Sequence, residues 1–521
     1  MSLRPPPPGV AYGGRRLVRL AAGCLAALVL APATTPGTAA AAPVSRVDWV
    51  GCGPRLECAT VPVPLDWARP GGATIALSVI RHLASRPGQR IGSLLVNPGG
   101  PGDSGVADVA DRGDLLDALT EGRFDIVGWD PRGSGNSAPV SCFADAAQRA
   151  AFWGPLVVPS TRADERRYLP KTVELARRCG ARNGALLAHI STADQVRDVD
   201  HLRRLVGDRQ LTFLGESNGT LMGQTYANMF PGRVRAMALD GVVDPIDYNG
   251  GTAAALAAGL TDADLVFGKF LELCEAAGPA RCALAGHGES VTRRVHRLLD
   301  RLRRMPLPAP GATPPGQLTY GEALALIKFN VPSDPADWPL SAQLLESGMQ
   351  GDGSVIKDIA AALVADQFRL GFEQNVALTC ADAPARQDAA QWPRVVRGLT
   401  AVSRIGGLPF GWLTGAPCAS WPTPSAVRYT GPWNAVTRTP ILLVNMRFEP
   451  NTPLVAAQRV QRRLGNAVLL IHDGYGHLNR ADPSACVSTA IGSYLVRLAT
   501  PPHGTVCPSD RQPFDPDFGQ P

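Results

Sequence analysis

The sequence predicts an α/β fold in which helices cover both faces of a mostly parallel sheet, with a mainly helical insertion between two strands. Two observations predict it. Short apolar runs alternate with helix-compatible segments over residues 91–239, which is typical of a parallel sheet. The alternation stops after residue 239 and resumes at residue 441. One sheet with an insertion explains this gap better than two tandem domains.

The composition is that of a large globular protein. The chain has 521 residues, of which 45% are hydrophobic and 18% are charged, unlike a disordered chain. Four arginines near the N-terminus account for four units of the formal net charge of +6. Because the net charge without these arginines is only weakly positive, the composition does not indicate nucleic-acid binding.

The first 42 residues have the features of a signal peptide. A basic segment precedes a short apolar run at residues 20–31, and small residues at 39–42 offer cleavage sites. The run is too short for a stable membrane anchor. Arg15-Arg16 leaves a twin-arginine signal open, whereas Cys24 lies too early in the run for lipidation. We therefore expect a secreted or cell-envelope protein without a stable membrane span.

The predicted elements follow in chain order. Prolines make residues 61–66 extended, because proline disfavours helix at the residue before it. Strand composition then marks residues 73–82, 91–96, 123–129, 211–214 and 234–239. Helices are expected at residues 192–205 and 221–229 in the first part, and at 263–277, 291–304 and 320–329 in the insertion. The last part reads as strand 441–445, helix 453–464, strand 467–472 and helix 484–498.

These elements predict a domain organisation. The first part of the sheet domain is expected at residues 43–246 and its second part at 438–507, with the helical cap at 247–437 between them. Residues 508–521 are rich in proline and aspartate, so we expect a loose tail.

The strand at 211–214 runs into Gly215-Glu216-Ser217-Asn218-Gly219, and a helix-compatible segment follows. Strand, Gly-x-Ser-x-Gly and helix form the context of a nucleophile elbow. The turn holds the serine in a strained conformation, and the glycines lack the side chains that would collide there. Ser217 is therefore the predicted nucleophile.

A serine hydroxyl needs a base, and the base needs a carboxylate that holds it. His477 follows the strand at 467–472 in a flexible glycine-containing turn and is the predicted base, with His472 as its rival. Glu449 lies between Ser217 and His477 in the loop after strand 441–445 and is the predicted acid. Glu449 could instead be a helix N-terminal charge, and Asp244 is the alternative acid.

The transition state needs N–H donors aimed at the oxyanion. The backbone N–H of Asn218 supplies one, and the glycine-rich loop after strand 91–96 supplies the second, for which we choose Gly100. A phosphate-binding loop is a poor alternative, because no Gly-Lys-Ser/Thr follows. No cysteine–histidine cluster suggests a metal, and no cofactor is predicted.

Together these residues resemble the secreted serine peptidases of the tripeptidyl aminopeptidase type, which have the α/β-hydrolase fold and are related to prolyl iminopeptidases. The motifs that carry the resemblance are Asn97-Pro-Gly-Gly-Pro-Gly-Asp-Ser-Gly105, Asp130-x-Arg132-Gly-x-Gly135-x-Ser137, Gly215-x-Ser217-x-Gly-Thr220, Glu449-Pro-x-Thr452-Pro and Gly476-His477. They span most of the mature chain and are jointly specific. The end of the chain looks like that family's TAP-like region.

The chain departs from the family pattern twice. Members usually have an aromatic residue where this chain has Asn218, and an aspartate where it has Glu449. Glutamate serves as the acid in other α/β hydrolases. Both departures keep a weakly active or non-catalytic exported homologue, acting as a binding protein, among the alternatives.

The resemblance implies an aminopeptidase that releases short peptides from free N-termini. Such a site needs a carboxylate for the substrate ammonium, and the candidates are Glu216, Asp244, Glu373 and Asp382. For any single one of them a structural or solvated role is the simpler interpretation. A carboxylesterase or lipase would use the same triad and remains the alternative enzyme. Peptide length, side-chain preference and oligomeric state are not predicted.

Ten cysteines follow the signal peptide, and an even number in an exported chain predicts disulfides. Short separations favour pairing between sequence neighbours, and for the last pair the resemblance implies it. The expected pairs are Cys52–Cys58, Cys142–Cys179, Cys274–Cys282, Cys380–Cys418 and Cys486–Cys507.

Overall fold

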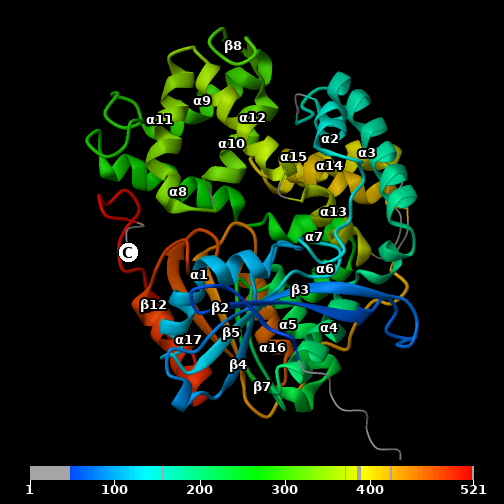
Figure 1. The fold of residues 1–521 in the computed structure, drawn as a ribbon. Coiled ribbons are helices and arrows are strands. Elements are labelled where there is room, and N and C mark those ends of the chain that lie inside the picture. The colour runs from blue at the N-terminus through cyan, green and yellow to red at the C-terminus, as the bar shows by residue number, and fades with distance from the viewer. Residues whose placement is uncertain are drawn as a thin grey trace, which may run out of the picture. The chain divides into compact units, whose positions relative to one another are not determined.

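The fold is built on a ten-stranded sheet, drawn in the lower half of Figure 1, in a computed structural model. The structure describes residues 47–518 except 155–157, 332, 370, 384–388 and 423–424, so the predicted signal peptide lies outside the described residues. The strand order is β1-β2-β3-β5-β4-β6-β7-β10-β11-β12. Strands β1 to β3 are antiparallel, as is the β3–β5 pair, and every pair from β5 to β12 is parallel. The predicted mostly parallel sheet is confirmed.

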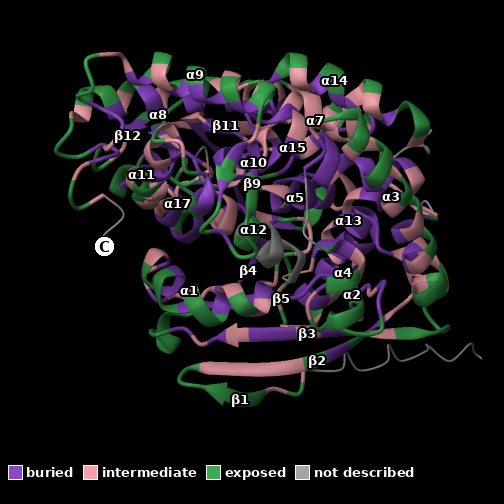
Figure 2. Ribbon diagram, turned by 90° about the horizontal axis from the view of Figure 1, so that it is seen from above, coloured by how far each residue is buried: buried purple, intermediate pink, exposed green. Residues whose placement is uncertain are grey.

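The strands are β1 (Val50–Gly53), β2 (Leu56–Pro64), β3 (Thr74–His82), β4 (Gly92–Asn97), β5 (Phe124–Trp129), β6 (Leu211–Glu216), β7 (Val234–Asp240), β10 (Ile441–Phe448), β11 (Ala467–Tyr475) and β12 (Val506–Pro508). Strand β12 was not predicted, because its three residues carry no apolar run. β1 lies exposed at the sheet edge, as Figure 2 shows.

Alternate residues of the central strands face opposite helix layers, as the pleat of a strand requires. Leu95 and Leu443 join one buried cluster with α4 (Thr192–Leu205), α5 (Asn218–Met229) and α16 (Leu454–Arg463). Leu94 and Leu442 join the cluster of α1 (Gly105–Leu119) and α17 (Ala485–Arg497) on the other face. Burial on both faces explains why these strands read as unbroken apolar runs.

Between β7 and β10 the described residues form helices and two short strands, β8 (Leu307–Ala309) and β9 (Gly316–Leu318). The helices are α6 (Pro245–Asn249), α7 (Thr252–Gly259), α8 (Ala263–Ala277), α9 (Val291–Arg304), α10 (Tyr320–Asn330), α11 (Trp338–Met349), α12 (Ser354–Arg369), α13 (Phe372–Ala381), α14 (Trp392–Val402) and α15 (Gly407–Pro409). Helices α8 to α12 share one apolar cluster, and they lie together in Figure 1.

A second helical cluster corrects the expected boundaries. Helices α2 (Ala146–Trp153) and α3 (Arg162–Asn183) come from the stretch expected in the sheet domain, but they pack with α13 and α14 (Figure 1). Trp153 stands edge-on to Phe372, and Tyr168 stands edge-on to Trp412. These contacts join segments that are more than two hundred residues apart, so no local pattern could reveal them.

The expected loose tail is also corrected. Phe514 is only 3% exposed and packs beside Phe270 of α8 and Trp338 of α11. One aromatic anchor holds the segment, although its composition of proline and aspartate favours a loose chain.

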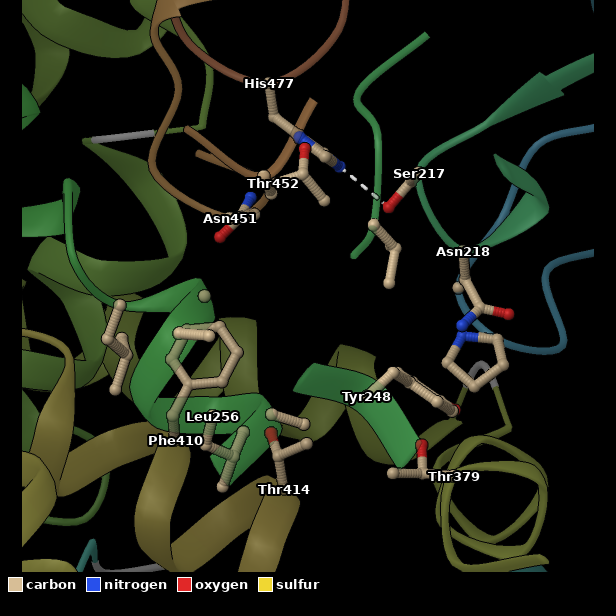
Figure 3. Close-up of a pocket in the computed structure, with 18 of the residues that line it drawn as sticks. Ser217, Asn218, Tyr248, Leu256, Thr379, Phe410, Thr414, Asn451, Thr452 and His477 are labelled. Carbon is tan, nitrogen blue, oxygen red and sulfur yellow. Dashed lines mark hydrogen bonds between the residues drawn. The ribbon is translucent and has the colours of Figure 1, made fainter. Parts of the chain in front are cut away.

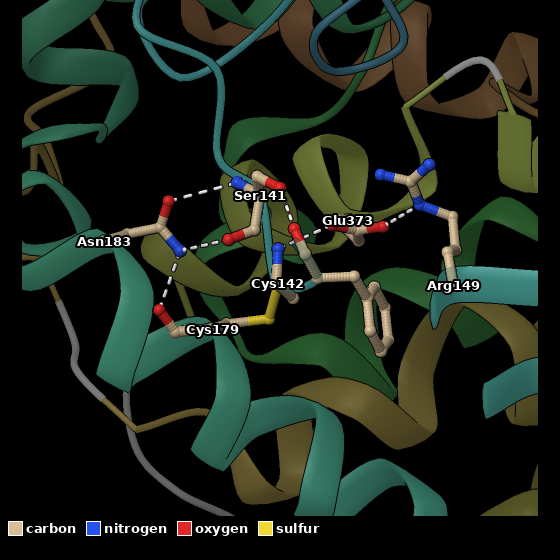
Figure 4. Close-up of a disulfide and its surroundings, with 7 residues drawn as sticks. Ser141, Cys142, Arg149, Cys179, Asn183 and Glu373 are labelled. Carbon is tan, nitrogen blue, oxygen red and sulfur yellow. Dashed lines mark hydrogen bonds and ion pairs between the residues drawn. A yellow bond between two sulfur atoms is a disulfide. The ribbon is translucent and has the colours of Figure 1, made fainter. Parts of the chain in front are cut away.

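The structure contains five disulfides, and they join the same partners that the sequence analysis paired. Figure 4 shows Cys142–Cys179 among hydrogen bonds that include Cys142 N–H to Glu373. Five disulfides are typical of proteins outside the reducing cytosol. In the described part of the chain, no helix meets the length and hydropathy needed to cross a bilayer.

Removing Cys142–Cys179 should destabilise the protein markedly. The bond closes a separation of 37 residues, for which chain entropy gives about 4 kcal/mol. We expect a Cys142→Ala/Cys179→Ala variant to lose that much in urea unfolding. The Cys52–Cys58 bond, with a separation of 6, is the matched control and should cost about 2 kcal/mol. Equal losses, or free thiols at these positions in non-reducing peptide mapping, would contradict the pairing.

Candidate active site

Ser217 sits in a tight turn between β6 and α5. Its φ of 53° lies in the left-handed region, which a serine occupies only under strain. A Cβ on Gly219 would stand 2.6 Å from the carbonyl oxygen of Asn97, and one on Gly215 would stand 2.6 Å from the carbonyl oxygen of Gly219. Both positions therefore require glycine, and together they allow the turn that lifts the serine out of the sheet.

Three predicted residues meet at the carboxyl ends of the strands. His477 Nε2 lies 2.9 Å from Ser217 Oγ, the dashed line of Figure 3. On the other side of the ring, Nδ1 lies 2.9 Å from Oε1 and 3.0 Å from Oε2 of Glu449. The serine follows β6, the glutamate follows β10 and the histidine follows β11. This continuous contact has the geometry of a serine–histidine–acid triad.

Glu449 is fixed by its surroundings. It is 0% exposed, and its Oε1 accepts the N–H groups of Asn451 at 2.9 Å and Thr452 at 3.4 Å. Its Oε2 accepts the N–H of Leu478 at 3.4 Å. These backbone donors hold both carboxylate oxygens in place. The Glu449 side chain therefore meets the His477 ring in a fixed orientation.

The alternative base, His472, and the alternative acid, Asp244, both lie outside this triad. His472 is buried in β11, where its Nε2 lies 3.4 Å from Ser509 Oγ and burial lowers its pKa to about 4. Asp244 caps α6 and forms ion pairs with Arg463 at 2.8 Å and Arg459 at 3.1 Å. Neither contacts Ser217 within the described interactions.

The predicted oxyanion donors flank Ser217. Asn218 begins α5, so its N–H has no carbonyl acceptor within the helix. Gly99 and Gly100 have φ of 104° and 101°, and a Cβ on Gly99 would meet Glu216 O at 2.6 Å and Ser217 Cβ at 2.9 Å. The glycine loop therefore lies directly against the elbow. Gly100 also lines the cavity in front of Ser217.

That cavity has a volume of about 390 Å³, and Ser217, Asn218 and His477 open into it. Much of its wall is apolar and comes from the stretch between β7 and β10. In Figure 3 Tyr248, Leu256 and Phe410 face the triad across the pocket. The same stretch supports the triad, because Ser333 O accepts the N–H of His477 at 2.9 Å.

Three of the four carboxylates expected to bind an ammonium group do not line the cavity. Glu216 is buried against Arg112, with bonds of 3.1 and 2.9 Å. Glu373 pairs with Arg149 and accepts the N–H of Cys142, as Figure 4 shows. Asp382 accepts the Thr192 hydroxyl at 2.6 Å. Each is committed to holding the fold, which corrects the expectation; Asp244 does line the cavity but is ion-paired.

Four charged residues that the sequence analysis did not select also line the cavity, namely Asp103, Asp247, Lys328 and Arg480. Asp103 follows the glycine loop, and the surrounding protein raises the pKa of its carboxyl, with Arg480 and His477 opposing the shift. Lys328 comes from α10, far along the chain. Asp103 could have been selected from the sequence, because it lies within the motif that begins at Asn97. Lys328 lies in no motif that would indicate its place in the cavity. No cluster of potential metal ligands occurs among the described residues.

Two family models match the chain. The α/β-hydrolase fold model matches residues 92–317, and the TAP-like protein model matches residues 410–507. The serine protease Hip1 of Mycobacterium tuberculosis is 31% identical, over 88% of this chain and 91% of that protein. The chain belongs to the TAP-like α/β hydrolases. This family membership was inferred from the motifs and is confirmed.

Other relatives of this TAP-like hydrolase carry two kinds of name. The tripeptidyl aminopeptidase of Streptomyces lividans is 29% identical, over 90% of this chain and 88% of its own length. The carboxylesterase B of Mycobacterium tuberculosis is 34% identical, over 91% of this chain and 92% of its own length. The TAP-like hydrolase thus resembles both peptidases and a carboxylesterase over nearly its whole length.

Proposed function

We propose that this TAP-like hydrolase is an exported serine hydrolase that works through Ser217, His477 and Glu449 and an acyl-enzyme. The continuous contact from Ser217 Oγ through the His477 ring to Glu449, with 2.9 Å on each side, carries the proposal. His477 Nε2 takes the hydroxyl proton as Ser217 Oγ attacks the substrate carbonyl. Glu449 stabilises the imidazolium that forms.

The N–H groups of Asn218 and Gly100 would receive the negative charge that develops on the carbonyl oxygen. When the tetrahedral intermediate collapses, His477 returns the proton to the leaving amine or alcohol, and the acyl group remains on Ser217. A water, activated by the same histidine, then releases the acyl group and frees the serine. The glycine loop and helix start beside Ser217 support this assignment.

We propose an aminopeptidase acting on short peptides as the physiological activity. The relatives named serine protease and tripeptidyl aminopeptidase support it. The helices between β7 and β10 wall the cavity, so we propose that residues 247–437 act as a lid that excludes folded proteins. Asp103 is the proposed ammonium anchor, because it lines the cavity and no ion pair within 4 Å engages it among the described residues.

Blocking the substrate amine should test this activity. We expect N-acetylation of a tripeptidyl-aminomethylcoumarin to lower kcat/KM at least about tenfold, since it removes one charge-assisted contact. Asp103→Asn should raise KM for the free peptide but leave the acetylated one unchanged. Asp111→Asn, on the outer side of α1, is the control. Equal rates on free and acetylated peptides in wild type would count against the aminopeptidase.

Carboxylesterase activity is the second candidate, favoured by the identity of 34% to carboxylesterase B. The same triad would cleave short acyl esters, whose alcohol leaves without needing an ammonium anchor. Comparing kcat/KM on free-amine peptides and on 4-nitrophenyl esters decides between them. A higher value on peptides supports the aminopeptidase, and turnover of esters alone supports the esterase.

A further inference from the structure

Lys328 is a buried ammonium in the wall of the catalytic cavity. It lies on α10, is 1% exposed and is one of the residues that line the cavity together with Ser217. Its Nζ donates to Asn451 Oδ1 at 2.7 Å and stands 4.5 Å from the ring centroid of Phe410. In Figure 3 Asn451 and Phe410 are on the opposite side of the pocket from Ser217 and Asn218.

Among the described residues, the other buried cations are paired with carboxylates. Arg132, 0% exposed, makes two bonds of 2.6 Å to the Asp198 carboxylate. Arg203 is likewise paired, 2.9 Å from Asp200. Within the described residues, no carboxylate lies within 4 Å of Lys328 Nζ. A buried amino group without an acidic partner loses much of its positive charge, and an anion bound beside it would restore that charge.

The neighbouring acid does not fill this role. Glu449 gives its oxygens to the His477 ring and to backbone N–H groups. Asn451 supplies a neutral amide oxygen, which satisfies one of the three N–H donors of an ammonium group. Burial lowers the pKa of Lys328 to about 7, while the charge of Glu449 acts in the opposite direction. Free donors of Lys328 therefore remain available to a ligand in the cavity.

We propose that Lys328 binds a carboxylate of the substrate, so that the enzyme prefers substrates whose acyl part carries an acidic group. A carboxylate would supply the missing negative charge and accept the remaining N–H groups. The acyl part would occupy the cavity that Ser217, Phe410 and Leu256 line. In a peptide this group is a glutamate or aspartate side chain, and in an ester it is a dicarboxylate half-ester. The inference rests on the proposed serine hydrolase function and names its substrate class.

Matched substrate pairs test the anchor. Tripeptidyl-aminomethylcoumarins that carry glutamate or glutamine at each of the three positions differ only in charge. At one of these positions, we expect the wild-type enzyme to have a kcat/KM at least about tenfold higher with glutamate than with glutamine. The difference should lie mainly in KM, because it reflects one charge-assisted hydrogen bond. Lys328→Met should reduce that ratio to about one, and Lys328→Arg should retain most of it. Lys269→Met, which removes an ammonium of α8 that does not line the cavity, is the control and should keep the wild-type ratio.

The outcomes separate the anchor from the proposed function. Peptide binding to Ser217→Ala, measured by calorimetry, should show the same preference without chemistry. For esterase activity, 4-nitrophenyl mono-adipate and 4-nitrophenyl hexanoate replace the peptides. Equal use of both members in every pair overturns the anchor while the hydrolase assignment stands. If Lys328→Met lowers kcat/KM equally for the acidic and the neutral substrate of a pair, Lys328 only supports Asn451. That result also overturns the proposed anchor. Preferential calorimetric binding with no hydrolysis and no fluorophosphonate labelling of wild type overturns the hydrolase and supports the anchor.

Discussion

Ser217→Ala is expected to abolish hydrolysis and covalent labelling while leaving the protein folded. The Ser217 hydroxyl oxygen is the atom proposed to form the acyl-enzyme, and it lies 2.9 Å from His477 Nε2. By analogy with other triads, we expect kcat to fall on the order of 10⁶-fold. Fluorophosphonate labelling followed by intact mass, together with turnover of peptide and ester substrates, measures the effect.

Ser333→Ala is the matched control for the nucleophile. Ser333 lines the same cavity, but only its backbone carbonyl contacts the base, so its side chain should be dispensable for labelling. Thermal unfolding checks that both variants fold. An acyl-enzyme on the Ser217→Ala variant would end the assignment of Ser217.

His477→Ala should have the second largest effect, a loss in kcat on the order of 10⁴- to 10⁶-fold. Without the ring, the Ser217 proton has no acceptor, and Glu449 becomes a buried carboxylate without its ring partner. Rates are compared on one substrate at saturating concentration, so that loss of binding does not imitate loss of chemistry.

His472→Ala separates the base from its rival. His472 is buried within β11, 3.4 Å from Ser509 Oγ, so we expect its replacement to lower stability and to leave kcat of the folded fraction near wild type. Thermal unfolding and titration of labelled sites give that fraction. An inactive His472→Ala variant together with an active His477→Ala variant would show that the wrong histidine was chosen.

The members of the proposed triad could be predicted because each one lies in a characteristic local sequence pattern. Ser217 stands between an apolar strand and a helix, and Glu449 and His477 each follow a strand of the same parallel sheet. The carboxyl ends of parallel strands meet at one edge, so side chains that follow them converge. The strain at Ser217 and the close packing of Gly219 are the physical counterpart of that motif.

The residues proposed to bind the substrate could not be predicted from such local patterns. Glu216 lies beside the nucleophile in sequence, yet it points to Arg112 on a different helix. Sequence adjacency within a strand turns consecutive side chains to opposite faces, so it does not place both in one cavity. Asp103 and Lys328 line the cavity from segments more than two hundred residues apart.

Local pattern thus suffices for most strands of the sheet, the elbow and the triad loops, each of which depends on residues close together in the chain or on the shared edge of one sheet. The pairing of the cysteines followed from their order in the chain and, for the last pair, from the family resemblance. Long-range packing alone decides that α2 and α3 join α13 and α14, that Phe514 anchors the C-terminal segment, and that Lys328 faces the catalytic cavity. The physical reason is that an aromatic or charged side chain has many possible partners in sequence, and only burial in the folded chain selects one.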